Sequence, residues 1–125
     1  MRNKFIFNLK EKDDFFRKLV FFSEKYKHFC LLDSNSSENN VPERYFEYDF
    51  ICAFDAIETL SSSDNSFIKI KNFHSKFNDW MFGCLSFDLK DEVFNLPSEG
   101  IDNLTSEHIS FFIPKYVMLI KENKL

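Results

Sequence analysis

The chain is poor in the residues that cross-link small proteins. Only three of its 125 residues are cysteines, and Cys30, Cys52 and Cys84 each lie inside an apolar run ("HFCLL", "FICAF", "FGCLS"). An odd number of cysteines without a C-x-x-C pair argues against a disulfide framework and against a zinc knuckle. We therefore predict three free thiols buried in strands.

Histidine is equally scarce and shows no metal-binding pattern. His28, His74 and His108 do not share the spacing of metal ligands, and none accompanies a nucleophile motif. Such histidines are more often surface or hydrogen-bonded residues than ligands. We expect no metal site and no cofactor in this chain.

Long apolar runs and excess positive charge are also missing. No run approaches the ~20 residues that a membrane-spanning helix needs, and the first residues, "MRNKFIFNLKEKDD", turn acidic too early for a signal peptide. The net charge is −4, the isoelectric point is near 5.4, and the lysines are spread out. We therefore expect no membrane, no nucleic-acid partner and a cytoplasmic location.

Apolar and aromatic residues, by contrast, are abundant. They make up 44% and 18% of the chain, with 18 phenylalanines, so the composition is that of a folded protein and not of a disordered one. A chain of this length can bury a core of its own. Residues 1–125 are therefore predicted to form a single domain.

The clearest periodic segment is residues 12–26, "KDDFFRKLVFFSEKY". Its apolar residues recur at helical spacing, and Asp13 or Asp14 can serve the first turn. The predicted buried stripe consists of Phe15, Phe16, Leu19, Val20, Phe22 and Tyr26.

The other elements follow from alternation, turn residues and short apolar runs. Residues 66–80 fit a helix with Ile70, Phe73 and Phe77 on one face and Asn65 or Ser66 as its cap; alternation also allows a strand, but we favour the helix. Strands are predicted at 4–9, 28–35, 45–60, 80–89, 108–114 and 115–123, a short helix or turn at 90–96, and loops at 34–44, 61–65 and 98–107. This order predicts an α+β fold, a largely antiparallel sheet packed with two or three helices.

The segment "DWMFGCLSFDLKDEVFNL", Asp79 to Leu96, has apolar residues on both faces of its strand. We therefore predict a central strand that is covered on both sides. Gly83 is expected where another backbone or ring approaches closely. Asp88 is expected to cap the turn that follows or to form an ion pair, and not to act as a catalyst.

Four segments resemble the N-terminal region of component I of the chorismate-utilising enzymes. They are "LLDS", "YFEYDFICAF", "FGCLSFDLKDEVFNLPSEGID" and "FFIPKYVMLIK", in the order of the family. The resemblance is to aminodeoxychorismate (para-aminobenzoate) synthase first and to anthranilate synthase second. Cys84 and Phe87 stand where the family usually has tyrosines, so hydroxyl contacts of those tyrosines are absent here.

This resemblance implies the N-terminal portion of the chorismate-utilising enzyme fold. In the family, Mg²⁺ and chorismate are held by a C-terminal catalytic domain, which these 125 residues do not contain. Glu43, Asp91 and Glu92 offer carboxylates, but no basic cluster faces them to hold a dianionic substrate. We therefore expect the chain alone to be inactive, with the C-terminal chorismate-binding domain as partner and a glutamine amidotransferase subunit as a further one.

The resemblance implies one effector-binding residue. The serine of the family's L-L-x-S strand end takes part in a small pocket for tryptophan, and it corresponds to Ser34. The pocket's other wall would lie in the C-terminal portion. The alternative is a loop hydroxyl that starts the turn "DSNSSENN".

Three functions remain open. The first is the non-catalytic N-terminal domain of aminodeoxychorismate synthase component I in folate biosynthesis, favoured because Asp33 replaces the glutamate of the tryptophan-sensitive L-L-E-S form. The second is the tryptophan-sensing domain of anthranilate synthase component I. The third is an unrelated protein-interaction module with a Phe-rich surface. The coding sequence after Leu125 would distinguish them.

Overall fold

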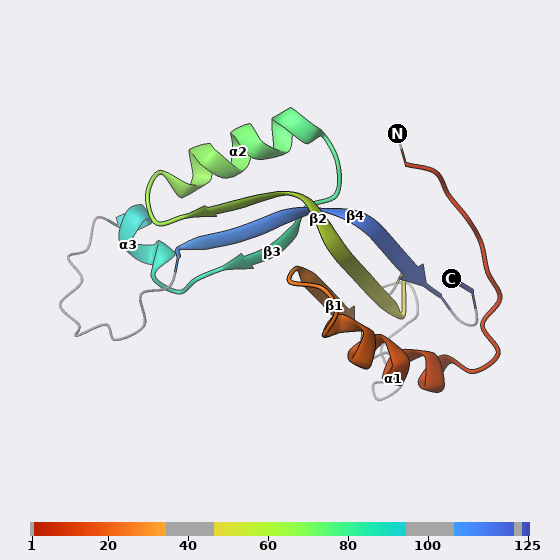
Figure 1. The fold of residues 1–125 in the computed structure, drawn as a ribbon. Helices are drawn as coiled ribbons and strands as arrows, with labels where there is room; N and C mark the ends of the chain where they lie inside the picture. The colour runs from red at the N-terminus through yellow and green to blue at the C-terminus, as the bar shows by residue number, and fades with distance from the viewer. Residues whose placement is uncertain (1, 35–46, 95–106, 122–123) are drawn as a thin grey trace. The chain divides into compact units, whose positions relative to one another are not determined.

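The structure, a computed structural model, describes residues 2–34, 47–94, 107–121 and 124–125. Within these ranges the chain forms three helices and four strands, and Figure 1 shows how they are arranged. In chain order they are α1 (Lys12–Ser23), β1 (Phe29–Asp33), β2 (Phe50–Ser62), α2 (Ser66–Phe77), β3 (Phe82–Leu85), α3 (Leu89–Phe94) and β4 (Ile109–Ile120). The predicted loops at 34–44 and 98–107 lie almost entirely outside the described residues.

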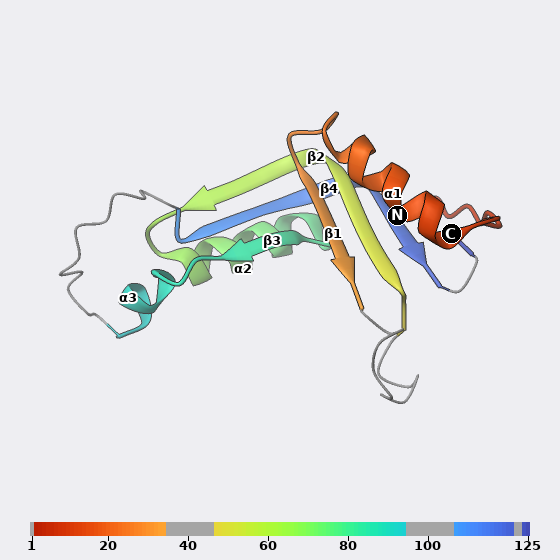
Figure 2. The ribbon, with the colours of Figure 1, turned by 90° about the horizontal axis from the view of Figure 1, so that it is seen from below.

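The strands form one antiparallel sheet in the order β1-β2-β4-β3. β1 pairs with the first half of β2, with Leu31 opposite Cys52. β3 pairs with the first half of β4, with Phe82 opposite Phe112 (Figure 2). The α+β class with an antiparallel sheet is confirmed, and β1 and β3 are its edge strands.

The chain divides into two compact units. Unit 1 comprises residues 1–55 and 115–125, and unit 2 comprises residues 56–114. β2 and β4 each contribute residues to both units. The single domain expected from the sequence stays a prediction.

Helix α1 supplies one wall of the core of unit 1. Leu19 is buried with Phe50, Cys52, Phe54 and Ile120. The predicted stripe is confirmed at Phe15, Phe16, Phe22 and Tyr26, which pack against this cluster. The prediction is wrong at Val20, since half of the surface of this residue is exposed. Val20 lies at the margin of the buried helical face, which is narrower than predicted.

Helix α2 is confirmed and lies along the sheet of unit 2 (Figure 1). Phe73 is buried, as the helical face predicted, and its ring centroid is 5.2 Å from that of Phe77. The helix ends at Asn78, which adopts a left-handed conformation and donates its N–H to the carbonyl of His74 at 2.7 Å. Asparagine is one of the few residues that adopt this geometry readily.

The prediction of a central strand at 80–89 is wrong. β3 has only four residues, lies at the edge of the sheet and buries Phe82 alone. Leu85 is 53% exposed and Phe87, beyond the strand, is 81% exposed. The sequence of an apolar strand does not show whether neighbouring elements cover it. In this sheet β3 has β4 as its one pairing partner among the described residues.

Two further strand predictions need correction. β4 runs without interruption from Ile109 to Ile120 through the buried Pro114, so the two strands expected on either side of that proline are one. Proline's fixed φ is compatible with extended backbone, although it donates no hydrogen bond to the ladder. The segment 4–9 forms an isolated bridge between Asn8 and Lys124, and Phe7 exchanges backbone hydrogen bonds with Leu125.

The cysteines occupy three different environments. Cys52 is buried, Cys30 is half-buried and Cys84 is exposed on the edge strand β3. All three are free thiols, as predicted, but burial is correct only for Cys52. Burial, together with the neighbouring Cys30, raises the pKa of the Cys52 thiol to about 12, which makes it a poor nucleophile.

Candidate functional site

Ser34, the effector-binding residue implied by the resemblance, directly follows β1. Its N–H donates to the carbonyl of Asp49 at 3.0 Å, which continues the pairing of β1 with β2. Its hydroxyl oxygen is buried and has no hydrogen-bond partner among the described residues. The described part of the chain thus places a buried polar atom at this strand end.

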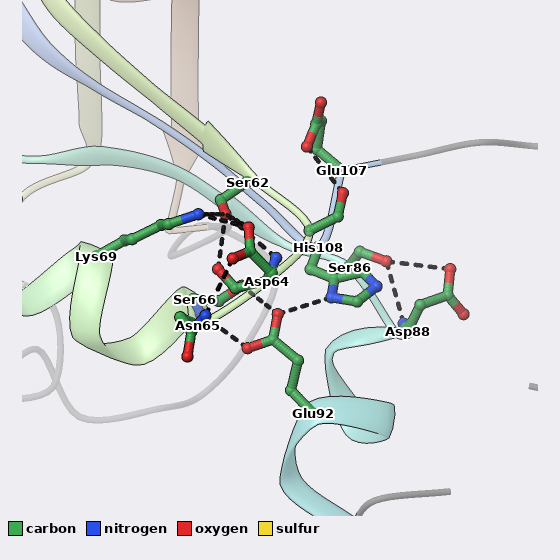
Figure 3. A network of polar contacts seen from close by, with 11 residues as sticks. Ser62, Asp64, Asn65, Ser66, Lys69, Ser86, Asp88, Glu92, Glu107 and His108 are labelled. Atoms are coloured by element: carbon green, nitrogen blue, oxygen red, sulfur yellow. Dashed lines mark hydrogen bonds and ion pairs between the residues drawn. The ribbon is translucent and has the colours of Figure 1, made fainter. Parts of the chain in front are cut away.

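The most connected polar site lies elsewhere, in unit 2. It consists of Ser66 at the start of α2, Glu92 on α3 and His108 directly before β4, which we call the Glu92 network (Figure 3). From the sequence alone, Glu92 is a carboxylate without a basic cluster and His108 an ordinary histidine, and no motif places either residue in a site.

The carboxylate of Glu92 is the centre of this network. One oxygen, Oε2, accepts the backbone N–H of Ser66 at 2.8 Å. The other, Oε1, accepts the Ser66 hydroxyl at 2.5 Å and lies 2.8 Å from Nδ1 of His108. Ser66 is fully buried, and the side chains of Glu92 and His108 are mostly buried. Glu92 therefore connects the beginnings of two elements to α3.

This contact explains how α2 begins without a local cap. Asn65 occupies the N-cap position in a left-handed conformation and makes no capping hydrogen bond with its side chain. The first N–H groups of a helix need acceptors, and a negative charge is favourable at that end of the helix dipole. Glu92 supplies both from a position 26 residues away in the sequence. Asn65 is thus the N-cap residue, as expected, but the capping hydrogen bond comes from Glu92 and not from the side chain of Asn65.

The protonation of Glu92 reflects two opposed effects. Burial acts to raise the pKa of its carboxyl, whereas the hydrogen bonds from Ser66 and His108 stabilise the charged form. The hydrogen bonds outweigh burial, so the pKa lies below its ordinary value of 4.5. Glu92 is consequently a carboxylate at neutral pH.

A second cluster surrounds the turn before α2. Lys69 donates to Asp64 Oδ1 at 2.5 Å and to the hydroxyl of Ser62 at 2.8 Å (Figure 3). That hydroxyl in turn donates to the carbonyl of Asp64 at 2.8 Å. The hydrogen bond from Lys69, followed by that from Asn65, lowers the pKa of the Asp64 carboxyl to about 2.

The start of α3 is fixed by Ser86. Its hydroxyl accepts the N–H of Asp88 at 3.1 Å, and its carbonyl accepts the N–H of Leu89 at 3.2 Å. Its own N–H donates to the carbonyl of His108 at 2.8 Å. Asp88, expected to be a cap or an ion-pair residue, accepts a hydrogen bond from the Ser86 hydroxyl at 3.4 Å and forms an ion pair with Lys90 Nζ at 3.8 Å.

Serine, glutamate and histidine occur together here, but not in the order of a catalytic triad. A nucleophilic serine needs the imidazole beside its hydroxyl, with the carboxylate behind the imidazole. In this network the carboxylate lies between Ser66 and His108, and Ser66 is fully buried. The arrangement stabilises structure and does not activate a nucleophile.

Metal binding finds no support in the described ranges. They contain no group of three or more histidine, cysteine, aspartate or glutamate side chains that could hold a metal ion. The Mg²⁺ of the resembled enzymes therefore has no fitting ligand set in this part of the chain.

No helix in the described part of the chain is long and apolar enough to cross a membrane.

Compared with protein-family models, with curated protein sequences and with solved structures, the chain matches none of them. The relation to chorismate-utilising enzymes consequently depends on the quoted segments alone.

Proposed function

We propose that this chain is the non-catalytic N-terminal domain of an aminodeoxychorismate synthase component I. In that role it packs with the chorismate-binding catalytic domain, which holds Mg²⁺ and the substrate. The domain would also help to seat the glutamine amidotransferase subunit. The whole enzyme transfers amide nitrogen to chorismate for folate biosynthesis.

The observation that carries the proposal is the pairing of the resembling segments. "LLDS" includes the end of β1, "YFEYDFICAF" includes the start of β2, "FGCL" is β3, and "FFIP" lies in β4. β1 pairs with β2 and β3 pairs with β4, both antiparallel. The four resembling segments thus account for every strand of the described sheet, which supports a relation to the N-terminal region of the family.

Exposed apolar side chains support the presence of a partner domain. Leu85, Phe87, Val93 and Phe94, on β3, α3 and the turn between them, are each more than half exposed. Monomeric soluble proteins rarely expose large groups of such side chains, whereas surfaces that bind another domain do so regularly. A chorismate-binding catalytic domain is the partner that this proposal assigns to them.

The test uses a catalytic domain of an aminodeoxychorismate synthase that is produced without its own N-terminal region. We expect the purified chain to form a complex with it in sedimentation and to raise its formation of aminodeoxychorismate from chorismate and ammonia. An unrelated α+β domain of similar size is the control. If the chain and the control behave alike, the proposal is wrong.

One observation favours the anthranilate synthase alternative. The buried Ser34 hydroxyl without a partner among the described residues is a polar group that a ligand could satisfy. With one wall of the pocket in the catalytic portion, we expect calorimetry at millimolar tryptophan to show weak binding or none. Saturable micromolar binding that Ser34→Ala abolishes would favour the tryptophan-sensing domain instead.

The third possibility, an unrelated interaction module, also accords with the exposed phenylalanines. The coding sequence after Leu125 separates it from the other two. A reading frame that continues into a chorismate-binding domain supports either synthase. A stop codon together with a failure to bind the catalytic domain supports the interaction module.

A further inference from the structure

We propose that the carboxylate of Glu92 holds α3 in place by capping α2, so that removing this carboxylate or its charge frees α3 while the sheet stays folded. Glu92 is then a conformational control residue. It determines whether the apolar side chains of α3 are presented in a fixed position.

The geometry supports this role because Glu92 is a single point of contact for three elements. Its two oxygens bind the N–H and hydroxyl of Ser66 on α2 and lie beside the imidazole of His108 at the start of β4. Each contact is 2.8 Å or shorter and lies in a mostly buried site. Hydrogen bonds to a charged group in such a site are stronger than those between neutral groups.

Helix α3 is short and has one buried residue in the described part of the chain. It comprises six residues, and isolated helices of that length do not form in water. Leu89 is its buried residue, and the carbonyls of Ser86, Phe87 and Asp88 accept the N–H groups of its first turn. Beyond these contacts at its beginning, Glu92 is the residue that secures the rest of the helix, including the exposed Val93 and Phe94.

The neighbouring charged groups cannot replace Glu92, because each contacts another residue. Asp91 lies 3.2 Å from Lys90 Nζ, and Asp64 lies 2.5 Å from Lys69 Nζ. The carboxylates of Asp88 and Glu107 contact the hydroxyls of Ser86 and Ser63. Among the charged side chains around the site, His108 is thus the one that faces the Glu92 carboxylate directly.

The test is amide hydrogen exchange of the 125-residue chain, resolved by residue. In Glu92→Ala we expect the amides of Ser66 and of α3 to exchange roughly tenfold faster, while those in the β3–β4 pairing stay within about twofold of wild type. Glu107→Ala is the matched control, because it removes an exposed carboxylate contact near the start of β4 and should leave α3 unchanged. Unchanged exchange of α3 in Glu92→Ala would overturn the proposal, as would a uniform rise over the sheet.

A second measurement follows the titration of Glu92 in the wild-type protein. Because the folded pKa of Glu92 lies below 4.5, its contribution is complete above that pH and is lost as the pH falls through the lowered value. After correction for intrinsic exchange rates, acidification should therefore increase the opening of α3 in wild type. Glu92→Gln cannot titrate and should show no such increase. An equal increase in both proteins would contradict the proposal.

Discussion

Among single residues, Gly83 lies so close to the backbone of a neighbouring strand that no side chain fits there. A Cβ placed there would overlap the carbonyl oxygen of Ser110 and would lie 2.6 Å from the Cα of Phe111. These are backbone atoms of the paired strand β4, which cannot move aside without disturbing the ladder. We expect Gly83→Ala to cost about 1–3 kcal/mol of stability, as typical overpacking does.

Urea midpoints measure this effect, and Cys84→Ala is the control on the same strand. Cys84 is exposed, so its substitution should change stability by no more than about 0.5 kcal/mol. Equal midpoints for the two variants would show that β3 can shift to accept a methyl group.

Asp64 provides a pH prediction at the same scale. Its hydrogen bond from Lys69 is the main reason that the pKa of its carboxyl falls to about 2 from 3.8. A lowered folded pKa means that this interaction stabilises the fold fully above pH 3.8 and is lost as the pH falls through about 2. In Lys69→Met we expect the carboxyl of Asp64, followed by NMR, to titrate closer to its ordinary pKa. If the titration midpoint of Asp64 is unchanged in Lys69→Met, the hydrogen bonds from Asn65 and Ser62 are enough to lower its pKa.

At the scale of elements, the edge position of β3 changes the expected cost of substitutions. Leu85 is half exposed, so Leu85→Ala should cost less than about 1 kcal/mol, and Phe87→Ala similarly little. Ile113 is fully buried on β4, so Ile113→Ala should cost about 2–5 kcal/mol through lost burial and a residual cavity. Urea midpoints of the three variants test this ranking. If Leu85→Ala lowers the free energy of unfolding as much as Ile113→Ala does, β3 is a covered central strand, as the apolar run suggested.

At the scale of the whole molecule, the proposed function predicts that the chain by itself is inactive. Chorismate chemistry in the resembled enzymes needs Mg²⁺, which stabilises developing charge, and the described residues contain no group that could hold a metal ion. We expect no aminodeoxychorismate or anthranilate when the chain is incubated with chorismate, Mg²⁺ and ammonia or glutamine. A no-protein control sets the background. Product above that background would show that the chain carries an active site of its own.

Much of the secondary structure could be predicted because its causes are local. The apolar spacing of α1 and the buried face of α2 at Phe73 arise from residues three or four apart, which meet whatever else the chain does. The close approach at Gly83 also followed from its place in an apolar strand. The sites were less predictable: Ser34 was named from a resemblance, and no local pattern pointed to Glu92 as a cap.

Local sequence patterns thus suffice for the α+β class, the positions of the helices and the free state of the thiols. The edge position of β3, the continuation of β4 through Pro114 and the capping of α2 by a carboxylate of α3 depend on how the chain folds. These features differ from the first group in the distance along the chain between the residues involved. Periodicity records which face of an element is apolar, but whether that face is covered depends on the order of the strands. Likewise, Ser66 and Glu92 are 26 residues apart and meet only once the fold has formed.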